Sequence, residues 1–103
     1  MTWFRTVPED SLAVEAGVRV NVGGASIAIF CTESGLRAVG DRCSHAEASL
    51  SEGEVFGDEV ECPRHGATFD LTTGAALTLP ASTPVPVYPV RVTDGVIEVE
   101  VGT

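Results

Sequence analysis

The chain has 103 residues, 15 of them acidic and 6 basic, which gives a formal net charge of −9 at pH 7. This length fits a single domain and leaves no room for a second catalytic module. The acidic balance makes nucleic acid and anionic membrane poor partners, so we expect neither; it suits plain solubility or attraction to basic patches on partner proteins.

The sequence also lacks the signals of membrane insertion and export. No apolar run approaches the roughly 18 residues of a membrane span. Residues 1–5 lack the long apolar region of a secretory signal. A cytoplasmic location is therefore expected.

Alternating apolar residues predict strands through the first forty residues. Residues 3–6 suit an edge strand, and residues 7–11 suit a loop or a short helical turn. Three valines alternate with polar residues over 17–22, which predicts a half-buried strand. A Gly-Gly pair then favours a hairpin turn, with a return strand over 26–31 and a further strand over 36–40.

The return strand contains one of the three cysteines. Cys31 lies on the same face of this strand as Ile27 and Ile29. A free cysteine behaves as a small hydrophobic residue. We therefore expect Cys31 in the core and not among metal ligands.

Two short segments hold both histidines and the other two cysteines. They read Cys43-Ser44-His45 and Cys62-Pro63-Arg64-His65, separated by sixteen residues. Sulfur and nitrogen ligands at such spacing predict a metal site. Zinc is one interpretation, but zinc sites more often pair Cys with Cys and His with His. Here each segment has one of each, which suits a cluster with two unlike irons.

The remaining sequence predicts short strands joined by turns. A Gly-Asp turn within 55–61 would fold the spacer into a hairpin and bring the two segments together. A strand is expected over 68–70 and a hairpin over 90–101, with Glu98 and Glu100 on its wet face. The run 79–89 holds four of the six prolines, so it should be extended and confined to a loop or sheet edge. No segment has helical periodicity, and the fold class expected is all-β.

The pattern C-x-H, sixteen residues, C-x-x-H resembles the Rieske motif, in which two cysteines bind one iron and two histidines bind the other. The resemblance covers essentially the whole chain and is closest to the soluble Rieske ferredoxins of bacterial non-haem iron oxygenase systems. It implies one [2Fe–2S] cluster, with Cys43 and Cys62 on the inner iron and His45 and His65 on the outer iron. The outer iron would be the one reduced, and electrons would pass through the imidazoles.

The resemblance also implies the architecture. We expect a single Rieske domain over residues 1–103, with stacked antiparallel sheets and a small cluster-binding subdomain at about 42–80. In this family a proline-bearing loop covers the cluster, and Pro80-Ala81 is the part of the chain expected there.

Residues next to the ligands predict a low reduction potential. Rieske proteins of the high-potential type have an extra cysteine in each loop, which form a disulfide, where this chain has Ala48 and Arg64. They also have a serine and a tyrosine where this chain has Ala67 and Phe69, and those hydroxyls bond to cluster or ligand sulfur. We expect a potential towards the bottom of the range of about −150 to +300 mV.

By this resemblance the protein is an electron carrier and not an enzyme. A Rieske oxygenase also needs a mononuclear iron site, for instance two histidines and a carboxylate, and both histidines are already assigned. The expected partners are a ferredoxin reductase and a terminal oxygenase or similar redox enzyme, with the carrier as a monomer. The alternatives are donation to another acceptor, such as an iron–sulfur assembly enzyme, a cluster-based redox sensor, or a zinc module.

Overall fold

The computed structural model describes residues 2–44, 47–64, 66–79, 81 and 83–102. Within these ranges the chain is all-β, as expected, and its only helices are two 3₁₀ turns, η1 (Glu9–Ser11) and η2 (Leu50–Glu52). None of the described helices is long and apolar enough to cross a membrane. The strands are β1 (Thr2–Pro8), β2 (Gly17–Val22), β3 (Ala25–Thr32), β4 (Gly35–Gly40), β5 (Glu54–Phe56), β6 (Glu59–Glu61), β7 (Thr68–Asp70), β8 (Val87–Tyr88), β9 (Val90–Thr93) and β10 (Val96–Val101).

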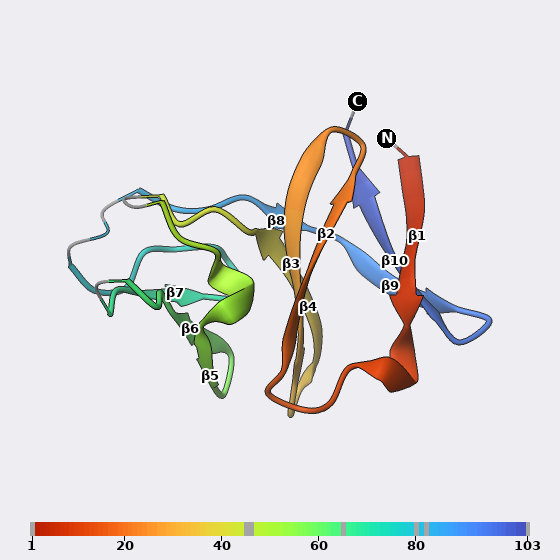
Figure 1. Cartoon of the computed structure of the whole chain (residues 1–103), viewed down its shortest axis with the longest axis horizontal. Helices are drawn as coiled ribbons and strands as arrows, with labels where there is room; N and C mark the ends of the chain where they lie inside the picture. Colours follow the sequence, from red (N-terminus) through yellow and green to blue (C-terminus); the bar gives the residue numbers. More distant parts are fainter. Residues whose placement is uncertain (1, 45–46, 65, 80, 82, 103) are drawn as a thin grey trace.

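These strands form three antiparallel sheets (Figure 1). The first has the order β1-β10-β9, the second β2-β3-β4-β8, and the third, a small sheet, β5-β6-β7. The two ends of the chain lie together because β1 pairs with β10, Thr2 opposite Val101. In Figure 1 the first two sheets lie to the right and centre, and the small sheet lies to the left with the segments that hold the sequence motif.

The four-stranded sheet separates two hydrophobic cores. Successive side chains of a strand point to opposite faces, and β3 is buried on both. We call the first the scaffold core; its buried residues are Leu12, Ile27, Ile29, Ala38, Ile97, Val99 and Val101. We call the second the loop core; its buried residues are Ala28, Phe30, Val39, Cys43, Leu50, Val55, Val60, Cys62, Ala67, Phe69, Leu71, Ala81 and Val85.

Cys31 has the place predicted for it. It is partly buried and packs against the scaffold core together with Ile27 and Ile29. Both cysteines of the motif lie in the loop core, beyond the opposite face of the sheet. Cys31 is therefore a packing residue.

The prediction that β10 has one buried and one wet face is wrong at Glu98. This side chain is only 6% exposed, and its carboxylate accepts hydrogen bonds from Arg91 Nε at 2.8 Å and Arg5 Nη1 at 3.3 Å. The hydrogen bond from Arg91 holds the pKa of Glu98 below its ordinary value, against the opposing effect of burial. Two arginines thus allow the burial of a carboxylate that the strand pattern alone would place in water.

A second carboxylate fixes the small sheet to the four-stranded sheet. Asp58 lies in the β5–β6 turn, where the sequence predicted one. Its carboxylate accepts hydrogen bonds from Ser34 Oγ at 2.6 Å, in the β3–β4 turn, and from Thr32 Oγ1 at 2.9 Å, at the end of β3. Arg37 Nε lies 3.4 Å from the same carboxylate. The hydrogen bonds from Ser34 and Thr32 lower the pKa of Asp58. The small sheet therefore has a fixed attachment at the end away from the motif.

Candidate metal centre

The first motif segment is a closed loop that follows β4. The Cys43 N–H donates a hydrogen bond to the Ala48 carbonyl at 3.0 Å, and Arg42 and Ser49 pair at the base of the loop. Cys43 is 2% exposed. The backbone therefore turns the thiol of Cys43 inward while Ser44, the next residue, stays exposed.

The second motif segment follows β6 and closes in the same way. The Cys62 N–H donates to the Ala67 carbonyl at 2.7 Å, and the Gly66 N–H donates back to the Cys62 carbonyl at 3.1 Å. Gly66 has φ of 76°, a conformation that glycine adopts without steric cost. In both loops, then, the cysteine N–H bonds to the carbonyl five residues further on, and Cys62, like Cys43, is buried, at 1% exposed.

The structure brings these two cysteines into one core, as the spacer hairpin predicted. Both pack in the loop core beside Ala67 and Phe69, and no disulfide joins them. Two buried thiols in apolar surroundings suit a metal cluster, because a thiolate removed from water needs a cation to balance its charge. The cysteine side of the predicted ligand set is thus suitable for an iron–sulfur group.

A third segment reaches the same end of the molecule. Ala81, in the proline-rich run, is 3% exposed and belongs to the loop core with both cysteines. The Ser44 hydroxyl donates to the Thr83 carbonyl at 2.6 Å, which joins this segment to the first loop. In Figure 1 the three segments meet at the left end of the molecule. The burial of Ala81 and the bond from Ser44 to Thr83 agree with the predicted cover over the site. Pro80 lies outside the described residues.

Comparison with known proteins decides the family. A sequence model described as the Rieske [2Fe-2S] domain matches residues 2–89. The chain belongs to the Rieske [2Fe–2S] domain family. It therefore carries one Rieske-type [2Fe–2S] cluster, and the zinc interpretation is excluded.

Ferredoxins are among the relatives of this Rieske chain. The anthranilate 1,2-dioxygenase ferredoxin subunit of Burkholderia cepacia is 47% identical over 88 residues, which is 85% of this chain and 81% of that protein. The ferredoxin of carbazole 1,9a-dioxygenase from Nocardioides aromaticivorans IC177 has a TM-score of 0.89 at 34% identity, covering 96% of this chain and 97% of that one. A chain in a complex of reduced oxygenase and oxidized ferredoxin in carbazole 1,9a-dioxygenase has a TM-score of 0.87 at 36% identity, covering 94% and 91%. The Rieske chain is accordingly an electron carrier and not itself an enzyme.

The histidine side of the Rieske site stays a prediction. His45 and His65 both lie outside the described residues. Their described neighbours Ser44 and Arg64 are exposed, whereas the paired cysteines are buried. Each loop therefore passes from the core to the surface within one or two residues after its cysteine.

The surroundings of the two Rieske cysteines contain the residues on which the low-potential prediction depends. Ala67 and Phe69 are both fully buried and pack in the same core as Cys43 and Cys62. Neither side chain has a hydroxyl to donate to sulfur. The low potential remains a prediction, but the two residues lie in the core where such donors would act.

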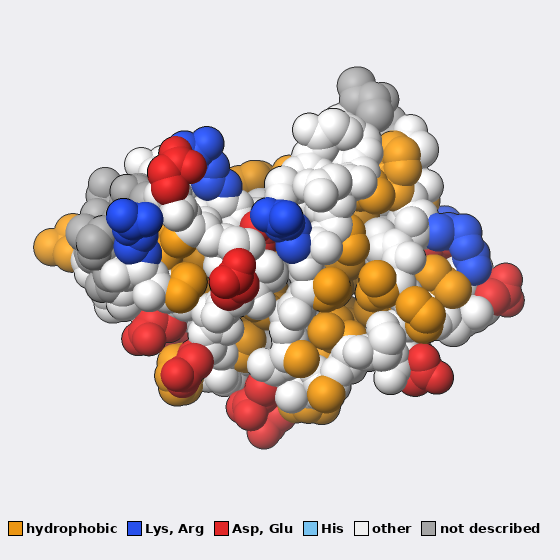
Figure 2. Space-filling model, in the orientation of Figure 1, with side chains coloured by type: hydrophobic (Ala, Val, Ile, Leu, Met, Phe, Trp, Pro, Cys, Tyr) orange, Lys and Arg blue, Asp and Glu red, His pale blue; other side chains and the backbone are white. Residues whose placement is uncertain are grey.

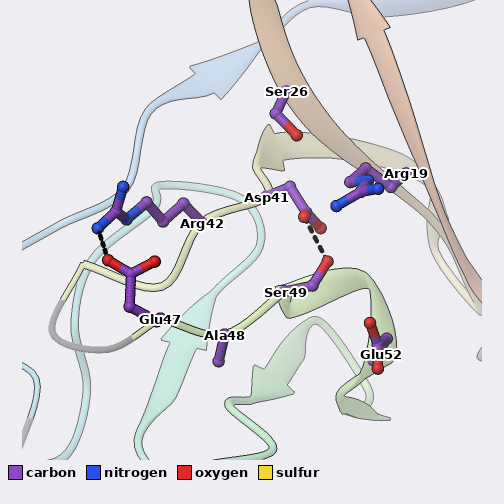
Figure 3. Close-up of a pocket in the computed structure, with 8 residues that line it drawn as sticks. All are labelled: Arg19, Ser26, Asp41, Arg42, Glu47, Ala48, Ser49 and Glu52. Atoms are coloured by element: carbon purple, nitrogen blue, oxygen red, sulfur yellow. Dashed lines mark hydrogen bonds and ion pairs between the residues drawn. The ribbon is translucent and has the colours of Figure 1, made fainter.

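Sequence reasoning missed one residue at the Rieske site, Asp41. Its side chain is 3% exposed. Its carboxylate accepts a hydrogen bond from the Ser49 hydroxyl (Figure 3) and another from the Ser51 N–H at 2.9 Å. An acidic residue two positions before a motif cysteine, followed by serines at 49 and 51, was the available signal. Alone it does not distinguish an anchor from a solvated residue.

Negative charge is distributed widely over this Rieske domain. On the face shown in Figure 2, acidic side chains extend from the small sheet at the left to the β9–β10 turn at the right, without gathering at one place. Close to the first loop, Arg42 and Glu47 form an exposed ion pair. A charge spread in this way acts at long range on an approaching partner.

Proposed function

We propose that this protein carries single electrons from a ferredoxin reductase to a terminal non-haem iron oxygenase, at low potential. The observation that carries the proposal is the burial of Cys43 and Cys62 in one core, within a chain whose near full-length relatives are dioxygenase ferredoxin subunits. The related ferredoxin that occurs in a complex with its oxygenase supports the choice of acceptor.

The ligand set that we propose is Cys43 and Cys62 on the inner iron and His45 and His65 on the outer iron. The two cysteines approach from the loop core, which excludes water from that side. We further propose that the whole chain is one Rieske domain and that residues 42–80 form its cluster-binding subdomain. The small sheet lies within this range and supports the second loop directly, because β6 ends at Glu61, one residue before Cys62.

The bound cluster supplies a centre that gains and loses one electron; the chain holds its ligands in place. The two N–H···O bonds that close the loops and the Ser44–Thr83 bond restrain both loops and the covering segment. A site that moves little between its two oxidation states has a small reorganisation to make on electron transfer. This rigidity is what a carrier requires, and it needs no acid–base group.

The surface beside the site suits a protein partner. Leu77 and Leu79 are 45% and 82% exposed, just before the covering segment. Exposed apolar side chains grouped near a functional site are typical of interaction surfaces. A cytoplasmic location also belongs to this proposal, and the unpaired thiol of Cys31 is consistent with a reducing compartment.

The test combines partner capture with electron transfer. Partners are captured from an extract of the source cells, and each is mixed without oxygen with the chemically reduced carrier while the visible absorbance of the cluster is followed. We expect a terminal oxygenase to reoxidise the carrier and a reductase to reduce it. Reoxidation only by another acceptor, such as an iron–sulfur assembly enzyme, would replace the oxygenase assignment. Capture that depends on oxidation state without any electron transfer would instead indicate a sensor.

A further inference from the structure

We propose that Asp41 is a positioning residue that fixes the first ligand loop and whose fixed negative charge lowers the reduction potential of the bound cluster. This inference rests on the proposed ligand set, because Cys43 is two residues from Asp41. It concerns the redox centre itself, and it holds whichever partner the carrier serves.

Asp41 joins both ends of the segment that contains the first loop. On the main chain, its N–H donates to the Ser26 carbonyl at 3.0 Å and its carbonyl accepts from the Leu50 N–H at 2.6 Å. On the side chain, one oxygen accepts from the Ser49 hydroxyl and the other from the Ser51 N–H at 2.9 Å. Figure 3 shows the Asp41 carboxylate directed at Ser49 across the base of the loop. The loop between them therefore has both of its ends held by one residue.

The second loop has no comparable anchor among the described residues. Its closure comes from backbone hydrogen bonds between Cys62 and residues Gly66 and Ala67. Its nearest described carboxylate on the N-terminal side, Glu61, is only partly buried. Among the described residues, a carboxylate anchor of this kind is therefore found only at the loop of Cys43.

Asp41 forms no ion pair in the described part of the chain. By contrast, Glu98 pairs with two arginines and Asp58 with Arg37. Arg19 lines the same hollow as Asp41, and Arg42 pairs with Glu47 instead (Figure 3). The carboxylate is held by a hydroxyl and an amide, so its negative charge remains close to Cys43.

A negative charge close to a redox centre disfavours the added electron. The Cα atoms of residues two apart lie at most about 7 Å from one another. For a charge roughly 10 Å away, Coulomb's law with an effective dielectric constant of about 20 gives about a tenfold change in the equilibrium constant for reduction. Removal of the charge should therefore make the cluster easier to reduce by about that factor.

The experiment measures the potential of the cluster-loaded protein by film voltammetry, without any partner. Asp41→Asn keeps the shape of the side chain and removes its charge, and it should raise the potential by about 59 mV, the equivalent of a tenfold change for one electron. Asp58→Asn is the matched control, because it alters another carboxylate that accepts hydrogen bonds from hydroxyls, at the far end of the small sheet. The reduction potential of the Asp58→Asn protein should equal that of the parent. Equal potentials for Asp41→Asn and the parent, or equal shifts in both variants, would overturn the proposal.

A second variant tests the positioning role if Asp41→Asn fails to assemble. Ser49→Ala removes one bond to the carboxylate and retains the charge, so the visible circular dichroism of the cluster should change and its loss to a chelator should be several-fold faster. Asp58→Asn should leave the spectrum unchanged. A Ser49→Ala protein with the spectrum and the cluster lifetime of the parent would overturn the positioning role. Absence of a Rieske spectrum in the parent would instead refute the proposed ligand set.

Discussion

The scaffold core and the loop core lie on opposite faces of the same sheet but have different tasks. From β3, Ile27 and Ile29 enter the scaffold core, while Ala28 and Phe30 enter the loop core. The scaffold core is closed by β10 and has aliphatic side chains at its centre. The loop core is closed by the loops themselves and contains both Rieske cysteines. One sheet therefore lets stability and cluster geometry be specified by separate sets of side chains.

The largest expected effect separates ligands from packing cysteines. His65→Ala should abolish the native cluster, because no other histidine is available to replace it except His45, which is itself a proposed ligand. Cys31→Ser, in the scaffold core, should leave the cluster assembled. Iron content and visible absorbance measure both outcomes. Loss of the cluster in Cys31→Ser would show that the ligand assignment is wrong.

Matched truncations in the two cores test their separation. Ile97→Ala in the scaffold core should cost about 2–5 kcal/mol and Phe69→Ala in the loop core about 3–5 kcal/mol, since each leaves a cavity. Denaturant unfolding measures both losses. Only Phe69→Ala should also change the cluster spectrum and potential. A spectrum equally altered by Ile97→Ala would mean that the two cores are not independent.

The distributed negative charge predicts a dependence of electron transfer on salt. The rate to the natural partner should fall as ionic strength rises and the Debye length shrinks from about 30 Å to about 8 Å. Steered association can change by tenfold or more over such a range. Stopped-flow measurements at several salt concentrations test this. A constant rate would leave solubility as the whole explanation of the charge.

A moderate effect is expected from hydroxyls added to the loop core. Ala67→Ser and Phe69→Tyr should each raise the potential if the new hydroxyl reaches a sulfur, because such bonds offset the charge added on reduction. Film voltammetry compares the parent with both variants at one pH. A parent potential already near about +300 mV, or two intact variants with unmoved potentials, would refute the hydrogen-bond account.

The smallest effect concerns the pH dependence of stability. The folded pKa of Glu98 is lowered from an ordinary value of 4.5 by Arg91. The contribution of Glu98 to the free energy of unfolding is therefore complete above pH 4.5 and is lost as pH falls through the folded pKa. Glu98→Gln should therefore be less stable than the parent at pH 7 and lose less stability on acidification below about 4.5. The fluorescence of Trp3, whose ring lies 4.0 Å from Arg91, reports unfolding. Parallel pH profiles in the two proteins would contradict the prediction.

Local patterns predicted most of the strands and the motif, and distant contacts explain what was missed. Glycine turns and period-two alternation found the hairpins, because both act within a few residues. Glu98 was misplaced because both of its arginine partners lie on neighbouring strands. Arg91 is opposite it on β9, and Arg5, on β1, is 93 residues away in the sequence. Asp41 was overlooked because its anchoring role appears only once the loop has folded back to Ser49. Burial of a charged group depends on partners that periodicity does not identify.

The most direct test of the proposed ligand set uses the small number of histidines. The chain has only two, His45 and His65, so ¹⁵N-labelled histidine reports on these residues alone. Pulsed EPR of the reduced protein should show nitrogen couplings from two imidazoles, and both should change when ¹⁴N-histidine is replaced by ¹⁵N-histidine. A reduced cluster whose couplings do not respond to the label would contradict the assignment of His45 and His65 as ligands.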